Sequence, residues 1–181
     1  MNTNSEIIRA AKDSARALYD QFGVNQSDRL VIAESCTAGM VAGLLAQIPG
    51  VSQWLCGSAV TYRESVKKEW LGVSSATLSN HLAESAETTC EMALGVLRRT
   101  AEANFSVAIT GHLGPEAPPE TDGQVYVAVA VRSGEGIEIY STHRINLDSR
   151  ERVARQYESA DRVLRIAREA MAEGDLLRRK V

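Results

Sequence analysis

The sequence predicts an α/β protein: a three-layer α/β/α sandwich around a mixed sheet of about five strands. Short apolar runs alternate with segments of helical periodicity in the order αβαβααβββα, which is typical of a sheet covered by helices. The run at 105–111 is short and apolar enough for the centre of a sheet. The segments 124–132 and 137–145 are separated by Ser-Gly-Glu-Gly and predict a β-hairpin, so the sheet should be mixed.

Length and composition limit the class of protein. The 181 residues suit one domain, expected to span 1–181, and no apolar run approaches the roughly 20 residues of a membrane span. The polar N-terminus does not resemble a signal peptide, and three scattered cysteines indicate reduced thiols and a cytoplasmic location. A net charge of −3 gives no support for nucleic-acid binding.

The first half of the chain contains four predicted elements after an N-terminal helix at 5–22. A strand is expected at Leu30–Glu34 and a helix at Thr37–Ile48, which Pro49-Gly50 closes. A second strand is expected at Trp54–Tyr62, followed by a short helix around Glu64–Trp70. The order strand, helix, strand, helix is the pattern of an open sheet with crossover helices.

The second half begins with the longest central helix, expected at His81–Glu102 from its inward apolar residues. The apolar strand Phe105–Gly111 follows, and a polar loop leads from it into the hairpin. A final helix is expected at about Arg150–Glu173.

Functional groups in such sheets gather at the carboxyl ends of the strands. Ser35 follows the first strand, close to the expected start of a helix, where unpaired N–H groups can stabilise an oxyanion or bind a phosphate. The small residues Ala38 and Gly39 would allow a ligand to approach the backbone. The alternative is that Ser35 and Thr37 only cap the helix.

Tyr62 and Lys67 occupy a second strand end and the short helix after it. Helical side chains lean toward the helix N-terminus, so Lys67 can reach back toward the same edge of the sheet. A desolvated lysine with a lowered pKa can take the proton of a serine nucleophile. The alternative is that Lys67 is solvated and pairs with Glu64.

Thr110 and Gly111 end the central strand, and Gly114-Pro115 turns the loop after it. The glycines again permit close approach of a ligand to the backbone, although a plain loop explains the same residues.

Together these stretches resemble the CinA C-terminal domain family of nicotinamide mononucleotide (NMN) amidohydrolases, also called PncC. The family pattern A-E-S-C-T-G-G is matched at 33–37 and 39, with Ala38 at the first glycine. The pattern T-Y-S-N-E-A-K is matched at Thr61, Tyr62 and Lys67, and T-G-x-x-G-P at 110–115. An arginine that the family carries before its last helix falls on Arg150.

The resemblance implies hydrolysis of NMN to nicotinate mononucleotide and ammonia, within NAD salvage and without a metal or another cofactor. It implies Ser35 as nucleophile, Lys67 as base and Tyr62 as a supporting hydrogen-bonding group. The remaining residues that it assigns to substrate binding are Cys36, Thr37, Gly39, Thr110, Gly111 and Arg150. A homo-oligomer, most simply a dimer, is also implied.

Three departures from the family pattern lie near the expected pocket. The loop at 116–123, EAPPETDG, is shorter than the family's glycine-rich loop, Glu84 stands in HLAES, and 149–154 is SRERVA. They leave two alternatives open: a catalytically silent nucleotide-binding protein, or an amidase for a different small amide. His81, His112 and His143 lack the spacing of metal ligands, and Cys36 is expected to pack inward.

Overall fold

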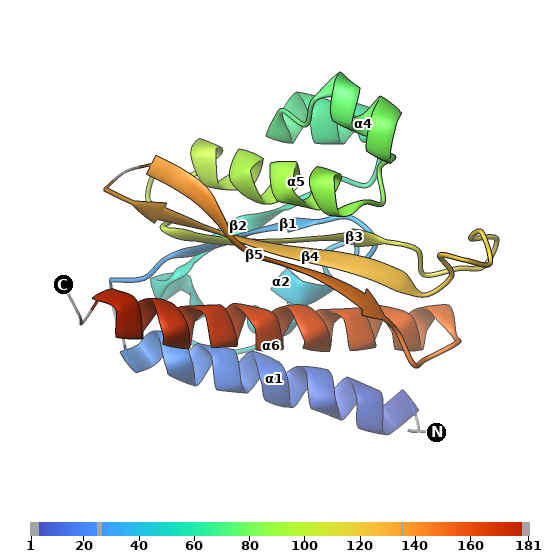
Figure 1. The fold of residues 1–181 in the computed structure, drawn as a ribbon. Coiled ribbons are helices and arrows are strands. Elements are labelled where there is room, and N and C mark those ends of the chain that lie inside the picture. The colour runs from blue at the N-terminus through green and yellow to red at the C-terminus, as the bar shows by residue number, and fades with distance from the viewer. Residues whose placement is uncertain (1–3, 25–26, 135, 179–181) are drawn as a thin grey trace.

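A five-stranded mixed sheet forms the middle layer of the protein, for which the computed structural model describes residues 4–24, 27–134 and 136–178 (Figure 1). The strands are β1 (Leu30–Glu34), β2 (Leu55–Val60), β3 (Phe105–Gly111), β4 (Gln124–Ser133) and β5 (Gly136–Asn146). Their order is β2-β1-β3-β4-β5, with β2, β1 and β3 parallel and β4 and β5 antiparallel to their neighbours. The carboxyl ends of β1, β2 and β3 therefore meet at one edge.

Helices cover both faces of the sheet (Figure 1). The helical elements are α1 (Asn4–Val24), α2 (Met40–Leu45), η1 (Val51–Gln53), α3 (Glu64–Val66), η2 (Lys67–Leu71), α4 (Ser75–His81), α5 (Ala86–Arg99) and α6 (Arg152–Arg178). Helices α1, α2 and α6 lie on one face, and α4 and α5 lie on the other. The predicted fold class is confirmed.

The pleat of the strands divides the apolar residues into two cores. On the α1/α2/α6 face the sheet presents large side chains, such as Ile32, Phe105 and Ile109. On the α5 face it presents mainly small ones, among them Ala33, Ala108, Ala128 and Ala130. The small residues allow α5 to pack closely on the sheet, beside the strand ends that carry the site.

The connection after β1 differs from the prediction. The helix expected at Thr37–Ile48 is the six-residue helix α2, because Ala38 and Gly39 adopt left-handed φ angles of 52° and 96°. Since an α-helix needs negative φ, these two residues form a turn between strand and helix.

The helix expected at His81–Glu102 was wrong at its N-terminal end. The expected helix is α5, which begins only at Ala86, and a separate helix that was not predicted, α4, precedes it and ends before Leu82, whose φ is 68°. Each begins with a capping serine: Ser74 accepts the N–H of Thr77, and Ser85 accepts the N–H of Thr88. The apolar periodicity continues through both helices, so only the caps mark the break.

The element after β2 is also irregular. After the short helix α3 the chain widens into the π-helical turn η2, which Gly72 ends with a φ of 75°. Helix α5 packs directly on this turn, because a Cβ at Gly95 would lie 2.0 Å from the Leu71 carbonyl oxygen. Only a glycine at position 95 permits this contact.

We expect Gly95→Ala to lower the free energy of unfolding by about 2 kcal/mol, since the added methyl group overlaps the backbone of η2. The matched control is Gly43→Ala in α2, where a Cβ meets nothing within 4 Å, so stability should rise by up to about 1 kcal/mol. Urea denaturation measures both changes. Equal stability of the two variants would contradict the packing described for Gly95.

Candidate active site

The buried carboxylate of Glu34 organises the chain after β1. Glu34 is 0% exposed and ends the strand. Its oxygens accept five hydrogen bonds of 2.8–3.1 Å, from Thr37 Oγ1, from Ser58 Oγ and from the N–H groups of Gly39, Val41 and Ala42. A buried charge is tolerated when it is hydrogen-bonded in this way. Glu34 therefore fixes the turn, the start of α2 and the neighbouring strand β2 relative to one another.

Ser35 follows Glu34 directly and is 5% exposed. Its N–H donates to the Ile109 carbonyl oxygen at 3.0 Å, which extends the pairing of β1 with β3. Its hydroxyl oxygen accepts a 2.8 Å hydrogen bond from Lys67 Nζ. The predicted approach of Lys67 to Ser35 is thus present, and the solvated alternative for this lysine is excluded.

Lys67 is 0% exposed at the first position of η2. Its ammonium group also donates to the Thr61 carbonyl oxygen at 2.9 Å. Burial lowers the pKa of Lys67, whereas the negative charge of Glu84 acts in the opposite direction. A larger fraction of this lysine is neutral near pH 7 than of an exposed lysine, so Lys67 can accept the proton of the Ser35 hydroxyl.

Cys36 is a poor alternative nucleophile. Its side chain lies in the core beside α2, as expected, although it also contributes to the wall of the pocket. Burial raises the pKa of the Cys36 thiol to about 12. Because the thiolate is the reactive form, this thiol is nearly inert at neutral pH.

A pocket of about 210 Å³ opens beside Ser35. Its walls come from five separate segments: the turn after β1, the chain after β2, the α4–α5 turn, the loop after β3 and the start of α6. The charged or titratable residues that line it include Glu84, His112, Glu116 and Arg152.

Tyr62 lies at the mouth of this pocket, with 55% of its surface exposed. Its hydroxyl accepts a 2.8 Å hydrogen bond from Arg152, which also donates to the Gly114 carbonyl oxygen. In the part of the chain that the structure describes, Tyr62 makes no hydrogen bond to Ser35 or Lys67. It is therefore placed to support Arg152 rather than the serine.

The loop after β3 is fastened to α6 by a second arginine. Arg155 is 7% exposed and donates to both carboxylate oxygens of Asp122, at 2.6 and 2.8 Å. This hydrogen bonding lowers the pKa of Asp122. The guanidinium packs against Gly114 and Gly123, where a Cβ would lie 2.9 and 3.1 Å from its nitrogens. The pocket wall at 112–117 is thereby fixed.

Three of the residues predicted to bind substrate lie behind the pocket instead. Thr37 and Gly39 are hydrogen-bonded to Glu34, so the Gly39 N–H is already used. Thr110 is fully buried, and its hydroxyl donates to the Ala83 carbonyl oxygen at 3.1 Å, which holds the α4–α5 turn. Gly111 does line the pocket.

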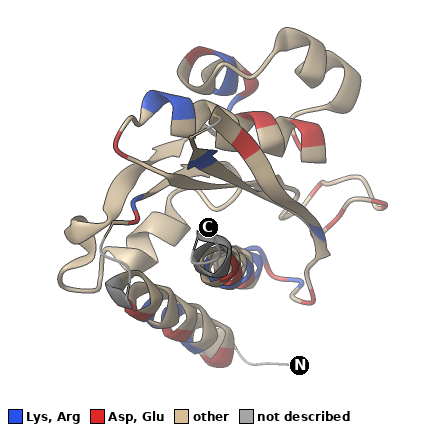
Figure 2. Ribbon diagram, turned by 60° about the vertical axis from the view of Figure 1, so that its left-hand side comes forward, with Lys and Arg blue, Asp and Glu red and all other residues tan. Residues whose placement is uncertain are grey.

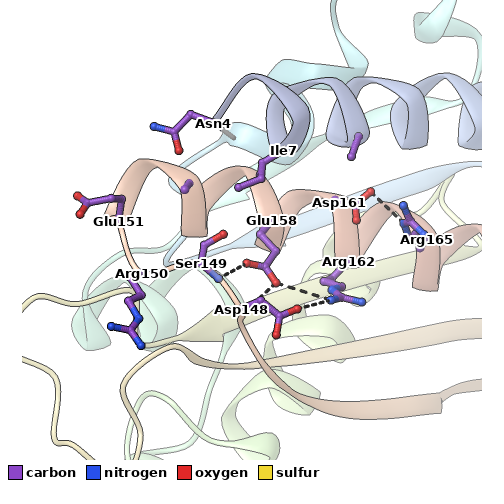
Figure 3. A pocket seen from close by; sticks show the side chains of 12 residues that line it. Asn4, Ile7, Asp148, Ser149, Arg150, Glu151, Glu158, Asp161, Arg162 and Arg165 are labelled. Atoms are coloured by element: carbon purple, nitrogen blue, oxygen red, sulfur yellow. Dashed lines mark hydrogen bonds and ion pairs between the residues drawn. The ribbon is translucent and has the colours of Figure 1, made fainter. Parts of the chain in front are cut away.

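Arg150, which was expected to bind the nucleotide, is not among the residues that line this pocket. Arg150 lines a different cavity, of about 740 Å³, next to the N-terminal ends of α1 and α6 (Figure 3). Helix α6 begins only at Arg152, and this residue points to Tyr62 and the pocket. Both arginines belong to one arginine-rich segment, so sequence alone could not choose between them.

The larger cavity is lined by charged groups that pair with one another (Figure 3). Glu158 accepts the N–H groups of Asp148 and Ser149, and Arg162 lies 3.5–3.6 Å from the carboxylates of Asp148 and Glu158. These interactions hold the start of α6 in place, so the smaller pocket is the candidate active site.

Other kinds of site find little support in the described ranges. No group of three or more His, Cys, Asp or Glu residues within them has an arrangement that could bind a metal ion. None of the helices in these ranges combines the length and apolar character needed to cross a bilayer. Figure 2 shows residues of both charges along α1, as in a solvated surface.

Comparison with known proteins places this geometry in a family. Residues 12–171 match the family model described as the CinA C-terminal domain. The chain belongs to the CinA C-terminal domain family. The match includes every element of the pocket, and it confirms the resemblance carried by the three motifs.

Two curated relatives represent the range of proteins in this family. The nicotinamide-nucleotide amidohydrolase PncC of Escherichia coli K12 is 36% identical over 137 residues, covering 75% of this chain and 79% of that protein. A CinA-like protein of Synechococcus elongatus is 37% identical over 127 residues, covering 69% of this chain but only 30% of that protein. The CinA domain described here thus corresponds to under a third of the longer relative.

Solved structures of CinA superfamily proteins share the fold. The competence/damage inducible protein CihA of Agrobacterium tumefaciens is 30% identical, with a TM-score of 0.79 over 89% of this chain and 95% of its own. The superfamily protein of Klebsiella pneumoniae 700603 is 26% identical, with a TM-score of 0.80 over 90% and 98%.

We expect Glu34→Gln to lower the free energy of unfolding by about 3 kcal/mol, because an amide cannot accept all five hydrogen bonds and leaves buried donors unpaired. Ser58→Ala removes one donor and should cost about 1 kcal/mol. Both changes are measured by chemical denaturation. A Glu34→Gln protein as stable as the parent would show that Glu34 does not organise this turn.

Proposed function

We propose that this chain is an amidohydrolase that converts NMN to nicotinate mononucleotide and ammonia. The observation that carries the proposal is the buried hydrogen bond between Ser35 and Lys67 at the wall of an open pocket. The relative in E. coli is named a nicotinamide-nucleotide amidohydrolase, and it aligns with three quarters of this chain. Together they support both the reaction type and the substrate.

The reaction begins when neutral Lys67 takes the proton of the Ser35 hydroxyl, and the Ser35 oxygen attacks the carboxamide carbon. In the described part of the chain, the N–H group of Cys36, which lines the pocket, donates to no other residue, so it is available to the oxyanion. Lys67 then returns the proton to the amide nitrogen, and ammonia leaves. The product of this half-reaction is an ester of Ser35.

Water completes the reaction in the same geometry. Lys67 takes a proton from a water molecule, and the resulting hydroxide attacks the ester carbonyl carbon. Collapse of this second oxyanion breaks the bond to Ser35, which regains its proton. The balance is one NMN and one water consumed, with one nicotinate mononucleotide and one ammonia formed. No metal or other cofactor is needed in this scheme.

The phosphate end of the substrate is assigned to Arg152 in place of Arg150. The guanidinium of Arg152 is held at the pocket mouth by Tyr62 and by the Gly114 carbonyl oxygen. An arginine in a fixed orientation can bind phosphate oxygens in a bidentate manner. Gly111 also lines the pocket, but a Cβ there would lie 2.5 Å from the Gln124 carbonyl oxygen, so the glycine permits the close pairing of β3 with β4.

A second candidate is an amidase for another small amide. The observation in its favour is that the carboxylates of Glu84 and Glu116 line the pocket and oppose the positive charge of Arg152. A neutral amide without a phosphate would not need that arginine. In either case we propose a single domain that acts as a homo-oligomer, which light scattering tests.

Ammonia release from NMN tests the proposal directly. We expect Ser35→Ala and Lys67→Met each to lower kcat by about 10³-fold or more, because nucleophile and base act as a unit. The matched control is Lys68→Met, the exposed neighbour of Lys67 on the same turn, which should stay within about twofold of the parent. Circular dichroism checks the fold. Full activity of Lys67→Met would contradict the mechanism, and release from a different amide alone would favour the second candidate.

The dependence of kcat/KM on pH gives an independent test. A protonated lysine cannot act as the base, so activity should be lost as the pH falls through the pKa of Lys67. Because burial lowers this pKa from 10.5, the acid limb should lie below pH 10.5. A limb at or above that pH would show that Lys67 behaves as an exposed lysine.

A further inference from the structure

The charges of the pocket are arranged in two poles. Glu84 enters from the α4–α5 turn, on the α5 side of the sheet, whereas Arg152 enters from α6 on the opposite side (Figure 1). Ser35 lies at the sheet edge between the two helical layers. A ligand in this pocket therefore meets Glu84 from one helical layer and Arg152 from the other, and Glu116 of the loop after β3 is a second acidic residue in the wall.

The backbone around Glu84 is firmly held. The carbonyl oxygen of Ala83 accepts from the Thr110 hydroxyl at 3.1 Å, and that of Leu82 accepts from the Thr88 hydroxyl at 2.7 Å. Ser85 caps α5 immediately afterwards. These contacts tie Glu84 to the end of β3 and to the first turn of α5, so its carboxylate has a defined place in the wall.

The Glu84 carboxylate has no hydrogen-bond or ion-pair partner among the residues described by the structure. It is nevertheless partly buried and lines the same pocket as Ser35, and its negative charge opposes the effect of burial on the pKa of Lys67. A half-buried carboxylate without a partner favours a cation beside it. Lys67 must lose its proton to act as the base, so in the reactive state it offers this carboxylate no positive charge.

We propose that Glu84 binds the positively charged ring of the substrate and makes the enzyme specific for a cationic, N-glycosylated pyridine carboxamide. This inference rests on the proposed function. The ring nitrogen of NMN carries a formal positive charge and the other end of the molecule carries a phosphate, so its two poles match Glu84 and Arg152. The negative charge of Glu84, which was an observation in favour of a different amide, would then pair with the positive ring of NMN.

Two forms of one ligand test this role. Oxidised NMN and its 1,4-dihydro form share the ribose and phosphate, but only the oxidised ring is cationic. Calorimetry at pH 8 with Ser35→Ala protein, which does not turn the ligand over, should show about tenfold tighter binding of the oxidised form. Adding Glu84→Gln should reduce this preference to less than about twofold, because the carboxylate is replaced by a neutral amide of the same shape.

The matched control is Glu87→Gln in the same background. Glu87 lies in the first turn of α5 and is exposed and paired with His81, so the net charge changes equally while the pocket does not. The preference for oxidised NMN should persist in this variant.

The outcomes separate the inference from the function on which it rests. Loss of the preference in Glu84→Gln alone supports the inference. An unchanged preference in Glu84→Gln, or an equal loss of affinity for both forms, would overturn the role of Glu84. In that case, release of ammonia from NMN by the parent enzyme would leave the proposed function standing. Absence of binding by either form together with absence of ammonia would overturn both.

Discussion

One buried anion, the Glu34 carboxylate, determines the local geometry on which the candidate site depends. It is fully enclosed, and it collects donors from a turn, from the first residues of α2 and from β2. These hydrogen bonds hold the turn that follows Ser35 against the end of β1 and the neighbouring strand β2. Ala38 and Gly39 have left-handed φ angles, and in the resulting turn the N–H groups of Gly39 and Val41 donate to this carboxylate.

The basic partner of Ser35 is positioned by packing rather than by charge. Lys67 is the first residue of a π-helical turn, and Gly95 of α5 lies against the end of that turn. The same enclosure that removes water from the ammonium group lowers its pKa. Burial of this amine lowers the stability of the folded protein, but it also favours the neutral form of Lys67 that can act as a base.

The success of prediction from sequence varied with the range of the interactions involved. Strands 30–34 and 105–111 were predicted at their observed bounds, because a short apolar run between polar residues is a local signal. Helix α4 and the start of α5 at Ala86 were missed, since the capping residues Ser74 and Ser85 are the main sequence marks of these two helix starts.

Within the site, strand ends and helical spacing brought Ser35 and Lys67 to one edge of the sheet, and the family resemblance supplied their expected roles. Glu34 was missed: a glutamate at a strand end is normally solvated, and its five partners come together only in the folded chain. The family resemblance pointed to Arg150, whereas the contacts that bring Arg152 to the pocket, with Tyr62 and Gly114, form only in the folded chain.

The five segments that wall the pocket are separate in the sequence, and contacts from the sheet and from the helical layers hold them together. The carboxylate of Glu34 ties the strand edge together, Thr110 holds the α4–α5 turn, and Arg155 fastens the loop to α6. No fragment of the chain retains all of these ties. Unfolding of any layer therefore disrupts the pocket. The site should be lost in the same cooperative transition as the global fold, and not at an earlier stage of denaturation.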